Sequence, residues 1–206
     1  SDTNRKVPET TKSKAVGLIP SRLGSTRHNN KALLPINGLP MVVHTMKRAQ
    51  LATSLDAVYV CTDSDEIAEV VLDNGGNVIM TSVEHRNGTE RIAEARHKLK
   101  DLGREFDFYI DIQGDEPLIN PLSIDLVHRC HAENNEHGST HCQIMLPTIP
   151  LEDPSSPHVV KVIRASDGRV LYLTRAVAPF PFRGSMKYHK HLSIISFTGG
   201  GLEWYA

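Results

Sequence analysis

The sequence predicts an α/β fold in which a mainly parallel sheet is covered by helices on both faces. Over residues 16–133, short apolar segments alternate with segments in which apolar residues recur at helical spacing. Such alternation is typical of β-α-β units, where a helix connects two parallel strands. After residue 140 the rhythm changes, and strand-like segments follow one another without a strong helix between them. We therefore expect a small antiparallel extension, serving as a substrate lid or a dimer surface.

Each expected element has its own local signal. Residues 16–19 form an apolar run that ends at Pro20, as expected for a buried strand. Pro40 precedes apolar residues at helical spacing, which predicts a helix there. The further elements are strands at residues 57–61, 77–80 and 106–112 and helices at residues 64–74, 90–102 and 122–133. In the last third, strands are expected at residues 143–146, 159–164 and 170–173, with a hairpin turn at residues 166–169.

Length and composition exclude several classes of protein. The chain has 206 residues, of which 39% are apolar, so we expect one domain over residues 15–206 after a disordered tail at residues 1–14. With 23 Lys and Arg against 24 Asp and Glu, the net charge of -1 does not favour a nucleic-acid partner. No apolar run is long enough to span a membrane, and three scattered cysteines do not suggest a disulfide framework. We expect a cytoplasmic protein.

A loop rich in small and cationic residues follows the first expected strand, at residues 21–31. Open α/β sheets bind ligands at the carboxyl ends of their strands, which is where this loop begins. Gly24 lets the backbone approach a polyanion, and Arg22 and Lys31 can neutralise its charge. The loop has neither the Walker A pattern nor the G-x-G-x-x-G pattern. On composition alone, a solvated basic loop is an equal alternative.

Two further loops are expected at the same sheet edge. The first precedes the third helix, which Asn87 or Thr89 could cap. The second, residues 113–117, directly follows a strand. There Asp115 could hold Mg²⁺ beside phosphate oxygens, and Gln113 could present its amide to a base or a sugar. Taken singly, these loops are an ordinary helix start and an ordinary acidic turn, but all three together indicate a site for a nucleoside triphosphate and its metal ion.

Four runs of residues resemble the family of 3-deoxy-manno-octulosonate cytidylyltransferases, also called CMP-Kdo synthetases. They are I-P-S-R, S-T-R and K within residues 19–31, C-T-D-S-D-E-I at residues 61–67, G-T-E-R at residues 88–91 and Q-G-D-E-P at residues 113–117. Stretches at residues 160–162, 171–176 and 189–192 are similar to the same family. The resemblance covers residues 15–206, in order and with similar spacing.

The resemblance implies a Rossmann-like fold of the nucleotidyltransferase type and a reaction of CTP with a 2-keto-3-deoxy sugar acid. The products would be pyrophosphate and a CMP-sugar for lipopolysaccharide or surface polysaccharide synthesis. It also implies Mg²⁺ as cofactor and a homodimer. By matched position, the catalytic residues would be Arg22, Lys31 and Asp115, with Asp115 as the metal ligand. The nucleotide-binding residues would be Arg22, Gly24, Ser25, Lys31, Asn87, Gly88, Thr89, Arg91 and Gln113, and the sugar-binding residues Gln113, Arg175 and His191.

The sequence departs from the family pattern at three places. His28-Asn29-Asn30 replaces Leu-Pro-Gly before the lysine of the first loop. Ile195 and Phe197 replace two tyrosines that follow the histidine of the family's His-x-Gly-x-Tyr-x-Tyr pattern. The family's C-terminal Gly-x-Asp-Thr-Pro segment, which supplies another metal-binding Asp, is absent. We therefore expect either that the chain is truncated relative to the family or that its metal binding is incomplete.

Alternative functions remain beside a Kdo cytidylyltransferase. The sugar could be an amino-substituted Kdo, and CMP-sialic-acid synthetases are related enzymes. Asp63-Ser64-Asp65 could be the D-x-D metal motif of a glycosyltransferase, although a helix start also explains both carboxylates. A non-catalytic nucleotide-binding relative would explain the altered lysine loop. Release of pyrophosphate from free CTP separates a cytidylyltransferase from the last two alternatives.

Overall fold

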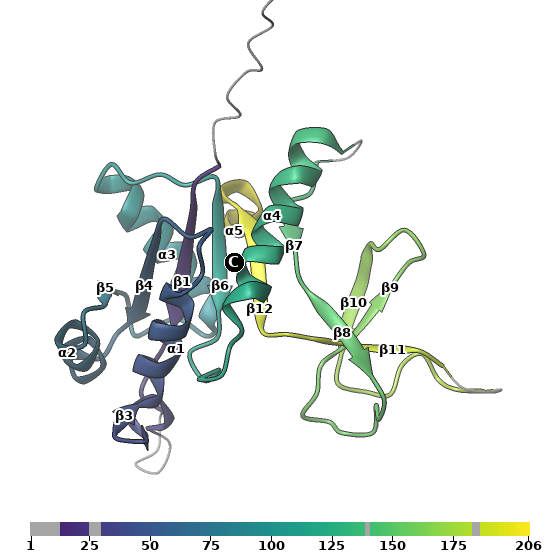
Figure 1. Ribbon diagram of the computed structural model, residues 1–206, viewed down its shortest axis with the longest axis horizontal. Coiled ribbons are helices and arrows are strands. Elements are labelled where there is room, and N and C mark those ends of the chain that lie inside the picture. The colour runs from purple at the N-terminus through teal and green to yellow at the C-terminus, as the bar shows by residue number, and fades with distance from the viewer. Residues whose placement is uncertain (1–12, 25–29, 139–140, 183–185) are drawn as a thin grey trace, which may run out of the picture.

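The structure, a computed structural model, confirms the predicted α/β class. It describes residues 13–24, 30–138, 141–182 and 186–206. Within these residues the main sheet has six strands in the order β5-β4-β1-β6-β12-β7 (Figure 1). The strands are β1 Ala15–Pro20, β4 Ala57–Thr62, β5 Asn77–Met80, β6 Phe108–Ile112, β7 Ile144–Met145 and β12 Ile194–Thr198. The four predicted strands β5, β4, β1 and β6 are parallel, whereas β12 is antiparallel to both of its neighbours.

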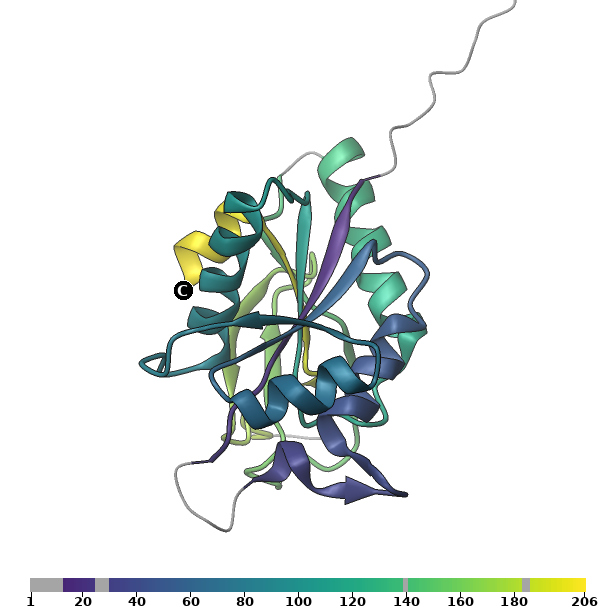
Figure 2. The same cartoon turned by 90° about the vertical axis from the view of Figure 1, so that its left-hand side faces the viewer.

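Helices cover both faces of the main sheet (Figure 2). They are α1 Met41–Gln50, α2 Asp65–Asp73, α3 Gly88–Asp101, α4 Pro121–His137 and α5 Gly199–Tyr205. Buried apolar side chains of α1, α2 and α4 pack against one face, and those of α3 and α5 pack against the other. The first four helices match the predicted ones, and α4 extends beyond the predicted end at residue 133. No helix within the described ranges combines the length and apolar character needed to cross a membrane.

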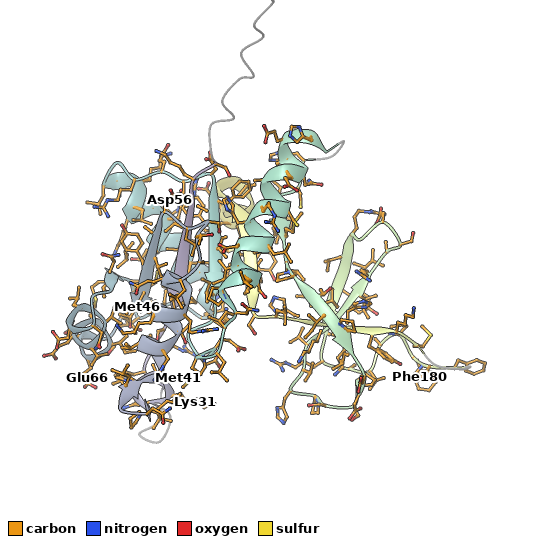
Figure 3. All side chains as sticks on the ribbon, viewed as in Figure 1. Lys31, Met41, Met46, Asp56, Glu66 and Phe180 are labelled. Atoms are coloured by element: carbon orange, nitrogen blue, oxygen red, sulfur yellow. The ribbon has the colours of Figure 1, made fainter. Side chains whose placement is uncertain are left out.

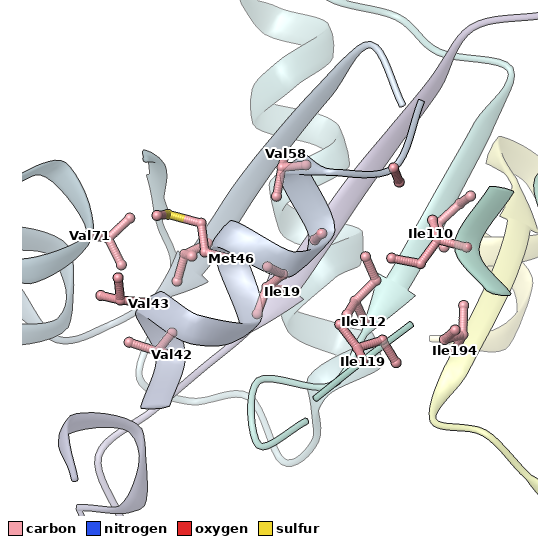
Figure 4. Packing of buried hydrophobic residues seen from close by; sticks show 14 of the residues in the cluster. Ile19, Val42, Val43, Met46, Val58, Val71, Ile110, Ile112, Ile119 and Ile194 are labelled. Carbon is pink, nitrogen blue, oxygen red and sulfur yellow. The ribbon is translucent and has the colours of Figure 1, made fainter. Parts of the chain in front are cut away.

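Alternate residues of each central strand pack into two separate apolar layers. In β1, Ala15 and Ile19 belong to the layer covered by α1, α2 and α4, whereas Val16 and Leu18 belong to the layer covered by α3 and α5. Figure 4 shows the first of these layers between the sheet and its helices. The segment leading into and forming β6 alternates apolar and polar residues in sequence, yet all five residues of β6 itself are buried. Its polar position, Asp111, is therefore enclosed in the protein rather than exposed to water.

The last third of the chain differs in part from the predicted antiparallel extension. A four-stranded antiparallel sheet, here called the small sheet, has the order β10-β9-β11-β8 and stands beside the main sheet in Figure 1. Its strands are β8 Thr148–Leu151, β9 Lys161–Arg164, β10 Val170–Thr174 and β11 Tyr188–His191. β9 and β10 form the predicted hairpin. However, β7 and β12 return to the main sheet, and the unpredicted helix α5 follows β12.

Two connections near the start of the chain complete the fold. A 3-10 helix, η1 Lys31–Leu33, and a hairpin of β2 Pro35–Ile36 with β3 Leu39–Pro40 connect β1 to α1. Ser13 and Lys14, which the sequence analysis assigned to the tail, are hydrogen-bonded to the domain. Ser13 Oγ lies 3.0 Å from His128 Nε2, and the Lys14 N–H donates to the Asp107 carboxylate at 2.8 Å.

Candidate active site

Three loops meet at the carboxyl edge of the main sheet. From β1 the chain crosses to β4 on one side, and β6 later pairs with β1 on the other side. Open α/β sheets bind ligands at such a switch in strand order. A pocket of about 450 Å³ lies there, a volume within the range of small-molecule sites. The predicted site residues that line it are Arg22, Gly24, Lys31, Asn87, Gly88, Arg91, Gln113 and Asp115.

Two glycines allow the second and third loops to pack directly on the end of β1. A Cβ atom added to Gly88 would lie 3.0 Å from Pro20 Cγ. A Cβ atom added to Gly114 would lie 2.9 Å from the Pro20 carbonyl oxygen, closer than side-chain carbons approach backbone in packed proteins. The second and third loops therefore both lie against the end of β1, where the first loop begins, as a shared site requires.

Arg22 and Lys31 bring two positive charges to the pocket. Both side chains are exposed, and Figure 3 shows Lys31 at the same end of the main sheet as Met41, the first residue of α1. Neither cation forms an ion pair with an Asp or Glu in the described ranges. A polyanion in the pocket would therefore find two cations available for charge-assisted hydrogen bonds. Ser25, the other predicted residue of this loop, lies outside the described residues.

The N-terminus of α3 forms a second wall of the pocket. Asn87 is the N-cap, because its Oδ1 accepts a hydrogen bond from the Glu90 N–H at 2.9 Å. The Glu90 carboxylate accepts a hydrogen bond from the Arg86 N–H at 2.8 Å, and this bond lowers the pKa of Glu90. Of the two caps that the sequence allowed, Asn87 and Thr89, the structure therefore has Asn87. Thr89 lies in the first turn of α3 but does not line the pocket.

Arg91 lines the pocket, but its charge is already compensated within the protein. The guanidinium is buried and donates to Thr81 Oγ1 at 2.6 Å, and it forms an ion pair with Asp63 at 3.1 Å. In this structure Arg91 therefore orders the pocket wall, and its predicted contact with the nucleotide stays a prediction. The same contact gives Asp63 a structural role, and Ser64 caps α2 by accepting a hydrogen bond from the Ile67 N–H.

The loop after β6 brings a carboxylate and an amide to the pocket. Asp115 is exposed at the pocket wall, and Gln113 is partly buried beside it. Mg²⁺ usually binds one or two protein carboxylates and takes its other ligands from phosphates and water. Asp115 near two cations therefore suits a metal ion that arrives with a nucleotide. A protein-only site is not present, because no three His, Cys, Asp or Glu side chains cluster in the part of the chain that the structure describes.

His85, a residue that the sequence did not single out, also lines the pocket. Its Nε2 forms a hydrogen bond with the Glu94 carboxylate, and its Nδ1 lies 4.0 Å from Glu90 Oε2. Burial raises the pKa of Glu94, but hydrogen bonds from Lys98, from the Ser82 N–H and from His85 outweigh it and lower that pKa to about 2. Both ring nitrogens of His85 therefore face carboxylates of α3. These partners come together only when α3 is folded, so no local sequence pattern could reveal them.

Arg175, predicted to contact the sugar, lies away from the pocket. It follows β10 and is exposed. Its guanidinium donates to the carbonyl oxygens of Pro157 and His158, each at 3.2 Å. Its own carbonyl oxygen accepts a hydrogen bond from the buried Lys161 Nζ at 2.7 Å. The structure therefore anchors Arg175 within the lobe that carries the small sheet.

His191, the other residue predicted to contact the sugar, is connected to the loop after β6. Its Nδ1 accepts a hydrogen bond from the Ser193 N–H at 3.3 Å, and Ser193 Oγ donates to Glu116 Oε1 at 3.0 Å. The His191 Nε2 is buried and has no hydrogen-bond partner among the residues described. Burial lowers the pKa of His191, so its neutral imidazole is favoured.

Comparisons with known proteins identify the relatives of this chain. The cytidylyltransferase family matches residues 16–199. The 3-deoxy-manno-octulosonate cytidylyltransferase of Zea mays is 40% identical over 199 residues, which are 94% of this chain and 64% of the maize protein. The 8-amino-3,8-dideoxy-manno-octulosonate cytidylyltransferase of Shewanella amazonensis is 40% identical over 187 residues, 88% of this chain and 73% of that protein.

One solved structure agrees with both the fold and the sequence comparison. CMP:2-keto-3-deoxy-manno-octonic acid synthetase complexed with CTP superposes with a TM-score of 0.82 at 32% identity, covering 94% of this chain and 77% of that one. The mainly parallel sheet, with a pocket at its switch in strand order, has the arrangement in which open α/β proteins bind ligands. The chain belongs to the cytidylyltransferase family. It spans less than two thirds of the length of its maize relative.

Proposed function

We propose that this chain transfers the cytidylyl group of CTP to a 2-keto-3-deoxy sugar acid. The products would be pyrophosphate and a CMP-sugar for lipopolysaccharide or surface polysaccharide synthesis. The observation that carries the proposal is the convergence of Arg22, Lys31 and Asp115 on one pocket in a member of the cytidylyltransferase family. The names of two relatives differ in the sugar, which is Kdo in maize and its 8-amino analogue in Shewanella. Both sugars are therefore candidate substrates.

The pocket residues support an in-line displacement at the α-phosphorus of CTP. Arg22 and Lys31 would bind the triphosphate and stabilise the negative charge on the departing pyrophosphate. Asn87 and Gly88 would approach the nucleoside, and the positive end of the α3 dipole would favour nearby phosphate. Asp115 would hold Mg²⁺, which when bound would neutralise further charge on the phosphates.

The sugar acid would bind beside the loop that follows β6. His191 is a candidate contact because Ser193 and Glu116 connect it to that loop. Arg175 is a cation that suits the sugar carboxylate, but it would have to exchange its bonds to two backbone carbonyls for bonds to the substrate. The structure therefore supports His191 more strongly than Arg175 as part of the sugar site.

We further propose that two copies of the chain associate through the small sheet. β10 is an edge strand of this sheet, and its residues 170–173 are exposed on both strand faces. Unpaired apolar edge strands invite pairing with a second chain, and a second copy would cover them by symmetry. A cytoplasmic location is also a proposal, which the small number of cysteines supports.

The proposed function is tested by pyrophosphate release from CTP in the presence of Mg²⁺. The acids to compare are Kdo, its 8-amino analogue and a sialic acid, each with and without the 206-residue chain. We expect release with Kdo or its analogue, and none when either substrate is left out. CTP binding without turnover on any acid would contradict the proposal and favour a non-catalytic relative. Transfer from an intact CMP-sugar without use of free CTP would favour a glycosyltransferase.

A further inference from the structure

Asp111 is a buried carboxylate near the pocket that the proposed chemistry does not use. It lies in β6 between β1 and β12 and is 2% exposed. Gln113 Nε2 lies 3.2 Å from each of its two carboxylate oxygens. Within the described ranges the Asp111 carboxylate forms no ion pair and no other hydrogen bond. Burial raises the pKa of Asp111 to about 7, and the hydrogen bond from Gln113 offsets this only in part.

The contact decides which end of the Gln113 amide is available to a ligand. An ionised carboxylate can only accept hydrogen bonds, so it pairs with the NH₂ group of Gln113. The amide oxygen of Gln113 is not used in this contact, so it can accept a hydrogen bond from a ligand. Because Gln113 lines the pocket, the pocket wall presents a hydrogen-bond acceptor at this point.

We propose that Asp111 is a positioning residue that orients the Gln113 amide so that its oxygen accepts a hydrogen bond from the substrate. This inference rests on the proposed function and restricts the group that Gln113 recognises to an N–H or O–H donor. The amino group of cytosine and a hydroxyl of the sugar acid are such donors. Uracil carries a carbonyl where cytosine carries its amino group, so contact with the base would also discriminate against UTP.

A double-mutant cycle tests this role by steady-state kinetics. Asp111→Leu removes the anchor without adding a charge, and Gln113→Ala removes the amide. Each should raise KM for one substrate about fivefold to tenfold with little change in kcat, the range expected for one hydrogen bond. Asp111→Leu should have no further effect in the Gln113→Ala background. Asp111→Asn keeps a hydrogen-bond acceptor and should raise KM less than Asp111→Leu does. Asp107→Asn is the control, because it changes an exposed residue next to the start of β6 and should leave KM and kcat unchanged.

The pH dependence of KM provides a measurement that a merely structural role would not alter. Below a pH of about 7, protonated Asp111 could donate to the Gln113 oxygen and turn the NH₂ group toward the substrate. KM should then rise as the pH falls, and Asp111→Leu should remove this rise. Asp111 acts on the Cys61 thiol of β4, as do Arg91 and Glu94 of α3. These three groups are present in both proteins, so the difference between the two profiles reports on Asp111.

Either of two kinetic results would overturn the positioning role. One is an unchanged KM for both substrates in Asp111→Leu, and the other is an equal rise of KM in the Gln113→Ala background. If the wild-type chain shows no turnover, the proposed function fails separately, and the role is tested by NMR. The Gln113 side-chain amide signal, assigned by its loss in Gln113→Ala, should then shift with pH near 7 in the wild type but not in Asp111→Leu. A signal that does not shift in the wild type would also overturn the role.

Discussion

Asp115 is exposed at the pocket wall, so its substitution can separate chemistry from folding. Asp115→Asn keeps the size of the side chain but removes the charge that would hold Mg²⁺. We expect pyrophosphate release to fall by roughly 100-fold or more, with little change in Tm. Asp101→Asn changes an exposed carboxylate at the end of α3 and is the matched control. Wild-type turnover in Asp115→Asn would show that the metal ligand is another group.

Lys31 is the second residue whose substitution should affect binding rather than stability. It is exposed at the start of η1, and no acidic side chain of the described residues pairs with it. Lys31→Ala removes one cation opposite the triphosphate, so we expect CTP to bind about tenfold more weakly by calorimetry. Lys47→Ala removes an exposed lysine whose Nζ, among the residues that the structure describes, bonds only to the Asn74 carbonyl, and CTP affinity should not change. Equal affinity of the wild type and Lys31→Ala would place the triphosphate elsewhere.

Asp111 also predicts how stability depends on pH. Its pKa is about 7 in the folded protein, whereas an unfolded Asp has a pKa of about 3.9. Between these values the folded state keeps a proton that the unfolded state has released. The contribution of Asp111 to the free energy of unfolding therefore falls as the pH rises from about 4 to about 7, and stays level above it.

Substitution of the same residue should remove this loss of stability. Asp111→Asn has no charge to bury, so its Tm should exceed that of the wild type at pH 8. We expect Tm to rise by about 2–4 °C for each kcal/mol that burial of the ionised Asp111 carboxylate costs. This rise should shrink as the pH falls toward about 5. Thermal unfolding of both proteins at the two pH values measures the difference. A gain that is the same at both would mean that the titration of Asp111 is not its cause.

At the scale of elements, the parallel half of the fold could be predicted because its signals are local. Ser64 and Asn87 cap α2 and α3 with bonds to residues three positions further along. β12 was missed because its place in the main sheet depends on antiparallel pairing with β6, far earlier in the chain. β11, whose sequence is Y-H-K-H, carries no apolar alternation that would indicate a strand. Both segments form strands because of the strands with which they pair, not because of a local sequence preference.

Contact between the loop after β6 and the end of β1 gives a prediction at this scale. In Gly114→Ala the new Cβ atom would lie 2.9 Å from the Pro20 carbonyl oxygen, which is backbone and cannot rotate away. The loop that carries Gln113 and Asp115 must therefore shift. We expect a loss of stability of about 1–3 kcal/mol together with a higher KM for CTP. Chemical denaturation and steady-state kinetics measure the two effects.

A matched glycine distinguishes this contact from a general effect of adding a methyl group. A Cβ atom at Gly200, in α5, would meet only Gln143 Oε1 at 3.7 Å, an ordinary contact distance. Gly200→Ala should therefore be neutral or stabilising, as alanine is favoured in a helix. If Gly114→Ala is equally neutral, the loop after β6 is not packed as closely on the end of β1 as the structure indicates.

For the whole molecule, the sequence could predict which residues share a pocket but not how their charges are balanced. Arg22 and Asp115 lie just after β1 and β6, and Lys31 ends the loop that follows β1, so the parallel strands bring these residues to one edge. The pairing of Arg91 with Asp63 joins two separate elements and appears only in the tertiary structure. Arg175 lies in the lobe of the small sheet. No local sequence pattern predicts how far this lobe lies from the pocket. The predicted role of Arg175 therefore depends on how the two sheets are arranged.

The small sheet leads to the last prediction, which concerns assembly. Figure 3 shows Phe180 on the lobe that stands away from the main sheet, and Leu171 and Tyr172 of β10 are 57% and 52% exposed. A second copy that covered this edge would bury apolar surface of the same strand in both chains. Sedimentation at micromolar concentration should therefore show a dimer, and Leu171→Glu should convert it to a monomer that remains folded. Leu72→Glu alters a leucine of α2 that is 58% exposed and should leave the dimer intact. A wild-type monomer, or equal disruption by both variants, would rule out β10 as the contact surface.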